Sequence, residues 1–130
     1  SSNKDHNDNR NNRNYKFIKV DIVNKKKITK IIRKYKPKVI FNLAAETHVD
    51  RSIDGPKNFI QTNINGTFNL LESLRFLQKK KINPKLVHIS TDEVYGDIKK
   101  GKRSNENFKY DPSSPYSASK ASADHLIKQY

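Results

Sequence analysis

The stretch Leu86-Val87-His88-Ile89-Ser90-Thr91-Asp92-Glu93-Val94-Tyr95-Gly96 decides the predicted fold. It begins as a short apolar run, typical of a strand buried on both faces, and changes to hydroxyl and carboxylate residues before Gly96 permits a turn. Hydroxyl and carboxylate side chains therefore lie at the carboxyl end of a predicted strand. In an open parallel α/β sheet the ligand crevice forms at that edge, so we expect a functional site there.

Strands and helices alternate on the amino-terminal side of this stretch. Residues 15–20 alternate in polarity and predict a strand that ends in Asp21-Ile22. Residues 28–35 carry apolar side chains at helical spacing until Pro37, and residues 38–43 predict a second buried strand. A polar loop at 46–52 leads to a long helix after Gly55-Pro56, in which Gly66 indicates close packing on the sheet. The inward side of that helix is predicted to be Phe59, Asn63, Thr67, Leu70, Leu74 and Leu77.

The carboxyl-terminal part repeats the pattern. Residues 85–90 predict the third strand, and the charged segment 97–111 lacks periodicity and predicts a loop. Ser114 and Pro115 suit an N-cap and first turn, so we expect a helix over 116–130. Three strands alternate with crossovers long enough for right-handed parallel units. The predicted class is α/β with a parallel sheet.

Composition bounds the function. The 130 residues suffice for one domain, and the absence of methionine, even at position 1, suggests an internal piece of a longer protein. The absence of cysteine excludes disulfides and thiolate metal sites. No apolar run approaches the roughly 18 residues of a membrane span, and residues 1–14 are polar and predict a loop or disorder. We expect a soluble cytoplasmic protein.

The formal charge of +14 suggests nucleic-acid binding, but its distribution argues against it. The lysines gather at 25–27, 79–81 and 99–100, all expected at helix edges or loops, without interleaved aromatic residues. A solvated surface is the simpler interpretation. The residues His48, Asp50, His88 and His125 match no metal-ligand spacing, so no metal is predicted.

Tyr116 and Lys120 stand four residues apart on the last predicted helix, hence on one face. A free tyrosine is a poor base at neutral pH, but an adjacent ammonium group stabilises its phenolate form. The pair can exchange a proton with an alcohol. A surface tyrosine packed on a lysine stem is the alternative interpretation, and the polar cluster at 90–93 favours the catalytic one.

Three motifs occur in order: Asn42-Leu43-Ala44-Ala45-Glu46-Thr47-His48-Val49-Asp50-Arg51-Ser52, Ile89 to Gly96, and Ser113-Ser114-Pro115-Tyr116-Ser117-Ala118-Ser119-Lys120. Together they resemble the extended short-chain dehydrogenase/reductase family, over about residues 15–130. The Thr91-Asp92-Glu93 triplet resembles the nucleotide-sugar 4,6-dehydratases of that family. The resemblance implies a partial, Rossmann-like, doubly wound NAD-binding domain over 15–130.

The resemblance also implies an NAD-dependent lyase that removes water between carbons 4 and 6 of a nucleotide-linked sugar. Tyr116 would deprotonate the hydroxyl on carbon 4, with Lys120 stabilising its phenolate form and bonding the nicotinamide ribose. Glu93 would act as general base at carbon 5 and Asp92 as general acid at the carbon 6 hydroxyl. Thr91 would hydrogen-bond the oxygen on carbon 4. Two adjacent carboxylates can take opposite roles only in different surroundings.

Further positions resemble the family's NAD contacts. Asp21 would accept from the adenine amino group, with Ile22 beside it; the alternative for Asp21 is a helix-capping turn, and the two are compatible. The remaining cofactor positions would be Leu43, Ala44, Ala45 and Thr62, with Thr47 at the edge between cofactor and sugar. A homodimer is implied for the full-length protein.

The chain departs from the family pattern in two places. It lacks the glycine-rich turn of the first βα unit, since its only glycines are Gly55, Gly66, Gly96 and Gly101, and it lacks the carboxyl-terminal substrate region. We therefore expect weak NAD binding and no turnover by the chain alone. Alternatives are a UDP-glucose 4,6-dehydratase, a nucleotide-sugar 4-epimerase, a non-catalytic assembly module or a basic nucleic-acid-binding piece.

Overall fold

A computed structural model describes residues 14–98, 101 and 103–130. Its sheet has two parallel strands, β1 (Val39–Asn42) and β2 (Lys85–His88), paired in register from Val39 opposite Lys85 to Asn42 opposite His88. The two predicted strands at 38–43 and 85–90 are thus confirmed, each shorter than expected. The parallel α/β class is confirmed as well.

The helical elements follow in order along the chain. They are α1 (Lys25–Tyr35), α2 (Val49–Asp54), α3 (Lys57–Phe59), the π-helical η1 (Ile60–Gly66), α4 (Thr67–Gln78), the 3₁₀ turn η2 (Asp92–Tyr95) and α5 (Pro115–Gln129). The prediction of a polar loop over 46–52 is wrong from Val49 onward. The Ser52 N–H donates to His48 O, and the Ser52 hydroxyl donates to Val49 O at 2.6 Å, so this buried serine closes the short helix α2.

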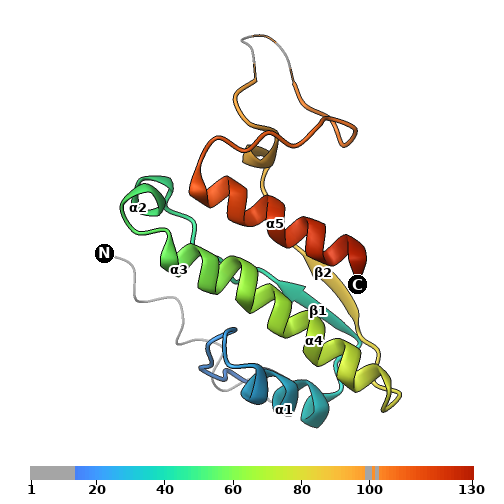
Figure 1. Cartoon of the computed structure of the whole chain (residues 1–130). Coiled ribbons are helices and arrows are strands. Elements are labelled where there is room, and N and C mark those ends of the chain that lie inside the picture. The colour runs from blue at the N-terminus through green and yellow to red at the C-terminus, as the bar shows by residue number, and fades with distance from the viewer. Residues whose placement is uncertain (1–13, 99–100, 102) are drawn as a thin grey trace.

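The core lies between the sheet and the helices that cover one side of it. Ile32 of α1 packs with Leu70 and Leu77 of α4, and Ile40 and Leu86 of the strands lie against this cluster. Figure 1 shows α1, α4 and α5 on the same side of the sheet. The stripe predicted for α1 faces this core through Ile32. The helix ends at Tyr35, and its C-cap, Lys36, has a left-handed φ of 43° and is followed by Pro37.

Described helices cover one face of the sheet only, so the doubly wound arrangement stays a prediction, whereas the expected burial of both strand faces is wrong for the described residues. Alternate side chains of β1 point away from the helices, and Val39, Phe41 and Leu43 remain 42%, 64% and 67% exposed. Successive side chains of a strand point to opposite faces, and no described helix covers the second face.

The strand predicted at 15–20 is also wrong. Residues 15–19 are exposed, and the segment forms no ladder with either strand of the described sheet. A strand needs a hydrogen-bonded neighbour. The segment is nevertheless extended enough for Lys16, Ile18, Val20 and Ile22 to line one cavity of about 520 Å³ beside β1.

The long helix is confirmed and has an unexpected middle. Its predicted inward residues are buried, apart from the partly buried Leu74, and η1 widens the helix into π turns, which occur often at functional sites. Gly66 does mark close packing, but against Ile22 and not against the sheet. A Cβ placed there would lie 2.5 Å from Ile22 Cγ2.

The last helix begins as predicted. Ser114 is its N-cap and forms a capping box with Ser117, with Pro115 in the first turn. Gly96 adopts a positive φ of 71° at the predicted turn, where any Cβ would clash with Asp111 O. None of the described helices has the length and apolarity to cross a membrane. The loop predicted for residues 1–14 lies outside the described residues up to position 13.

Candidate active site

Two of the three predicted polar segments leave the sheet side by side. Residues 43–47 follow β1, and Thr91 to Glu93 follow β2 after two intervening residues. Because β1 and β2 are parallel neighbours, both segments leave the same edge of the sheet. This edge is where the sequence predicted the site.

The third segment reaches this edge through α5. Lys120 is 4% exposed, and its ammonium group donates to Ile89 O at 2.6 Å, directly beyond β2. Burial lowers the pKa of Lys120, and the charge of Asp124 opposes that shift. Tyr116 is buried as well, with its ring edge-on to Phe59 at 6.4 Å, and its N–H donates to Ser52 Oγ.

The acid pair begins η2, which packs against α5. Thr91 caps this turn by accepting from the Glu93 N–H at 3.3 Å, and buried Val94 anchors it. Asp92 and Glu93 are both exposed. Among the described residues no hydrogen bond joins Tyr116 to Thr91, Asp92 or Glu93, so the structure brings together their elements and leaves their side chains apart.

Asn63 connects two of these segments and was not assigned a role from the sequence. Its side-chain oxygen accepts from the Glu46 N–H at 2.9 Å, and its amide donates to Glu46 O and to Ser119 Oγ at 2.8 Å. The Ser119 hydroxyl in turn donates to Tyr116 O. Asn63 lies inside η1 and is 2% exposed, so a buried polar residue on an apolar helix face was the signal.

The predicted cofactor residues lie around η1 and the end of β1. Ile22 contacts the position of Gly66 at the end of η1, and Thr62 lies partly buried within η1. Leu43 and Ala44 are exposed after β1, Ala45 is partly buried, and Thr47 is exposed.

Asp21 Oδ1 accepts from the Val23 N–H at 2.9 Å in a turn before α1. The N-cap of α1 is Asn24, whose side chain accepts from the Lys27 N–H, so the helix-capping alternative for Asp21 is wrong. The second carboxylate oxygen of Asp21 can accept from the adenine amino group, and Tyr116 and Lys120 can bond ribose hydroxyls. These residues therefore fit the two ends of NAD. The glycine-rich pyrophosphate turn is absent from the sequence.

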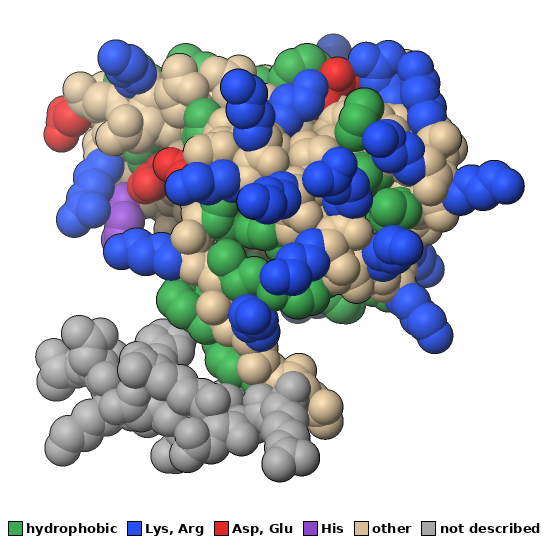
Figure 2. Space-filling model, turned by 90° about the horizontal axis from the view of Figure 1, so that it is seen from below, with side chains coloured by type: hydrophobic (Ala, Val, Ile, Leu, Met, Phe, Trp, Pro, Cys, Tyr) green, Lys and Arg blue, Asp and Glu red, His purple; other side chains and the backbone are tan. Residues whose placement is uncertain are grey.

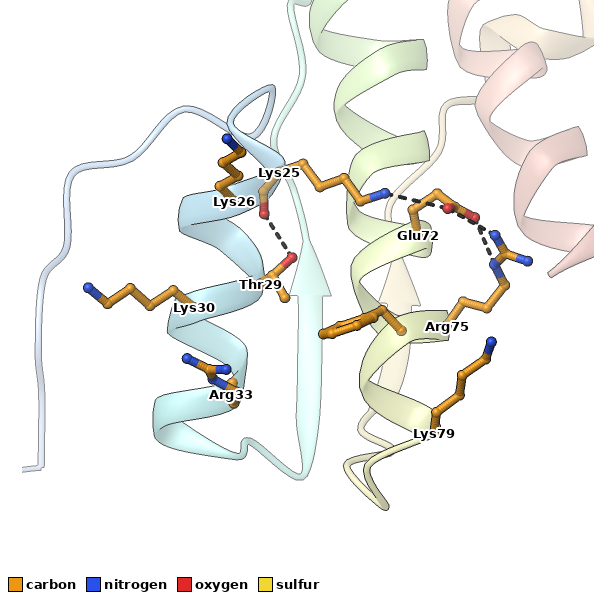
Figure 3. A pocket seen from close by; sticks show the side chains of 9 residues that line it. Lys25, Lys26, Thr29, Lys30, Arg33, Glu72, Arg75 and Lys79 are labelled. Carbon is orange, nitrogen blue, oxygen red and sulfur yellow. Dashed lines mark hydrogen bonds and ion pairs between the residues drawn. The ribbon is translucent and has the colours of Figure 1, made fainter.

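The basic surface forms a separate feature. Figure 2 shows Lys and Arg side chains spread over one whole face, pointing outward into solvent. Figure 3 shows the groove between α1 and α4, a cavity of about 670 Å³, where Glu72 pairs with Arg75 and with Lys25. The groove is lined by Lys25, Lys26, Thr29, Lys30, Arg33, Glu72, Arg75, Phe76 and Lys79, none of which is a predicted site residue.

Comparison with known proteins gives the family of the chain. The family described as GDP-mannose 4,6 dehydratase matches residues 1–130. A curated relative from Sinorhizobium fredii, named probable dTDP-glucose 4,6-dehydratase, is 48% identical over 119 residues, covering 88% of this chain and 34% of the relative. The chain spans about a third of the length of the curated relatives it matches.

Two solved structures share the fold. A dTDP-glucose 4,6-dehydratase from Streptomyces venezuelae with NAD bound gives a TM-score of 0.79 at 38% identity, covering 88% of this chain and 34% of that chain. A UDP-glucose 4-epimerase from Thermus thermophilus in complex with NAD gives 0.77 at 32% identity, covering 85% and 35%. The chain therefore belongs to the GDP-mannose 4,6 dehydratase family, and the predicted resemblance to extended short-chain dehydrogenases/reductases is confirmed.

Proposed function

We propose that this chain carries the catalytic centre of an NAD-dependent nucleotide-sugar 4,6-dehydratase, which converts dTDP-glucose to dTDP-4-keto-6-deoxyglucose. One observation carries the proposal. The Lys120 ammonium group lies 2.6 Å from Ile89 O, so the helix that bears Tyr116 is fixed at the strand end that bears Thr91, Asp92 and Glu93. A phenol and an ammonium group on α5, and a hydroxyl and two acids at the start of η2, are thus carried by elements that pack together, and we expect them to face one crevice in the complete protein.

Oxidation at carbon 4 needs a base for its hydroxyl proton. Tyr116 takes that proton, and the positive charge of Lys120 stabilises the phenolate that precedes the transfer. Thr91, which already bonds the backbone of η2, offers its hydroxyl to the oxygen on carbon 4. The ketone formed at carbon 4 acidifies the neighbouring carbon 5.

Loss of water needs one base and one acid. Glu93 removes the proton from carbon 5, and Asp92 protonates the hydroxyl that leaves carbon 6, so the two carbons become a double bond and water departs. Both carboxylates are exposed in the described structure. A substrate that covers them unequally would give them the different surroundings that opposite roles require.

When bound, NAD would accept the hydride from carbon 4 and return it to carbon 6 while a proton returns to carbon 5, which gives the 4-keto-6-deoxy sugar. Asp21 and Ile22 would hold its adenine end, and Tyr116 and Lys120 would hold its nicotinamide ribose. Leu43, Ala44, Ala45 and Thr62 would line the space between, and Thr47 would lie where cofactor and sugar meet. The missing pyrophosphate turn would be supplied by the family's first βα unit outside this sequence.

We propose that further strands of the complete domain occupy the space beside β1. One edge of β1 has no partner strand among the described residues. A cavity of about 520 Å³ lies beside β1 and is lined by Ile18, Val20, Ile28 and Ile40, among other residues. An unpaired, apolar strand edge is a template for another strand. Such strands, with helices over Phe41 on the second face, would complete a doubly wound Rossmann-like sheet.

We propose a homodimer for the complete protein, acting in the cytoplasm. Ile60 and Phe68, on the long helix, and Tyr130, after α5, are 47%, 40% and 52% exposed, and the rings of Phe68 and Tyr130 meet edge-on at 6.4 Å. An apolar patch on two long helices suits a second copy. A charged substitution at Phe68 that yields monomers on size-exclusion chromatography would support this interface.

The test uses the complete protein with dTDP-glucose and detects the 4-keto sugar. Tyr116→Phe should abolish product, and Tyr35→Phe, a control on exposed α1, should leave turnover unchanged. Glu93→Gln should still allow oxidation at carbon 4 but should block loss of water. Formation of a 4-epimer would instead favour the epimerase alternative, and full activity of Tyr116→Phe would refute the assigned role.

A further inference from the structure

The polar side chains of Asn42 and His88 form a hydrogen-bonded line across the two strands. The Ala44 N–H donates to Asn42 Oδ1 at 3.3 Å, which orients the amide so that Asn42 Nδ2 donates to His88 Nδ1 at 3.0 Å. Because Nδ1 accepts, the proton of the neutral ring is on Nε2. The line therefore runs from the predicted cofactor loop through β1 to β2 and ends at the proton on His88 Nε2, which is buried and has no hydrogen-bond partner among the described residues.

That proton faces Asp124 of α5. His88 Nε2 lies 3.7 Å from Asp124 Oδ1, and Asp124 Oδ2 accepts from Ser90 Oγ at 2.5 Å and from the Tyr110 hydroxyl at 3.1 Å. The side chains of His88 and Asp124 are only 7% and 11% exposed. A carboxylate so deeply buried needs donors, and here they come from β2, from the residues after it and from the segment before α5.

Asp124 and Lys120 stand one turn apart on α5 and reach neighbouring residues. Lys120 donates to Ile89 O, and Asp124 accepts from Ser90. Two adjacent residues at the end of β2 are thus held by one face of α5. The next residue in the chain is Thr91, which begins the acid-bearing turn.

Charges around this cluster act on one another. Burial and the charge of Lys120 lower the pKa of His88, and Asp124 opposes both. Burial and then the charge of Asp124 raise the pKa of Tyr110 to about 12. Tyr110 also contacts the rings of Tyr95 and His125, and Lys128 Nζ lies 5.7 Å above its ring.

We propose that Asp124 is a positioning residue for the reaction proposed above, on which this inference rests. It ties the strand end that carries Thr91, Asp92 and Glu93 to the helix that carries Tyr116 and Lys120. Asn42 and His88 lie between this tie and the loop after β1, with His88 Nε2 3.7 Å from Asp124 Oδ1 and not hydrogen-bonded to it.

The test compares three substitutions in the complete protein. Asp124→Ala removes the hydrogen bonds from Ser90 and Tyr110. It should lower kcat by about 100-fold with little change in KM, because a displacement of the reacting groups by about 1 Å has an effect of that size. Asp124→Asn keeps an acceptor but removes the charge, so kcat should fall less. Burial lowers the pKa of Lys120 and the charge of Asp124 opposes that shift, so without this charge the alkaline limb of the pH–rate profile should move to lower pH. Asp54→Asn, an exposed control at the end of α2, should behave like the parent.

A second readout does not depend on turnover. In an NMR titration, the Asp124→Asn substitution should lower the pKa of His88 further, because Asp124 opposes the effects of burial and of Lys120. Parental kcat and pH profile in Asp124→Asn, or an unmoved His88 titration, would overturn the inference. If the parent forms no 4-keto sugar, the proposed function fails, and the His88 titration still decides whether Asp124 is placed as inferred.

Discussion

Replacement of Gly66 by alanine should destabilise the chain, although alanine is the better helix former. In an open helix this change would stabilise by about 1 kcal/mol. Here the new Cβ would lie 2.5 Å from Ile22 Cγ2, a methyl group on a stiff, branched side chain that cannot swing away. Overpacking of this kind costs roughly 1–3 kcal/mol, so the net loss should be about 0–2 kcal/mol.

The substitution should also weaken NAD binding in the complete protein, because Ile22 adjoins Asp21, the proposed adenine contact. Urea unfolding followed by circular dichroism measures the stability, and titration calorimetry measures the binding. Gly55→Ala is the matched control, since its Cβ would lie 3.8 Å from Arg51 O, an ordinary contact. A Gly66→Ala protein that is more stable than the parent by about 1 kcal/mol would show that Ile22 does not pack there.

Four further outcomes follow from the described contacts. Leu77→Ala, at a fully buried core position, should lower the free energy of unfolding by about 2–5 kcal/mol, measured in urea. Asn63→Ala should lower the free energy of unfolding by about 1–3 kcal/mol for each polar group that loses its partner, and the Glu46 N–H is one such group. It should also lower kcat. Hydrogen bonds from Arg75 and Tyr130 lower the pKa of Glu72 from 4.5 to about 2, so its stabilising effect is complete above pH 4.5 and is lost as the pH falls toward 2. Glu72→Gln should therefore flatten the pH dependence of stability in that range, and an unchanged slope would refute the pairing. The chain alone should show no tight NAD binding by calorimetry, and NAD-dependent dehydration by it would contradict the need for a glycine-rich turn.

Local patterns were sufficient for the elements that carry their own signals. The apolar stripe ended by Pro37 predicted α1, the Ser114 cap predicted the start of α5, and Gly96 predicted a turn that needs positive φ. These features depend on a few neighbouring residues. The prediction of a strand at 15–20 was wrong because a strand also needs a distant segment to supply its hydrogen bonds, and neither described strand pairs with these residues.

Residue types and their spacing predicted the site residues, but they did not predict the contacts between distant residues that hold the site in place. The spacing of Tyr116 and Lys120 indicates a shared helix face, but contacts between distant residues, such as Asn63 with Glu46, cannot be read from spacing. Asp124 lies four residues after Lys120 on that face, a signal that the sequence contains and that was overlooked. The π turns of η1 left no mark in the apolar pattern, because the inward residues kept helical spacing on both sides.

The uncovered face of β1 has a consequence for production of this chain. Residues 39–45 contain no charge, proline or glycine, and three of them expose large apolar side chains beside a strand edge that no described strand pairs with. Such windows are steric-zipper candidates, since identical copies can stack edge to edge. Expressed without its flanks, the chain should collect in inclusion bodies and bind thioflavin T, and a lysine in place of Phe41 should increase its yield in the supernatant.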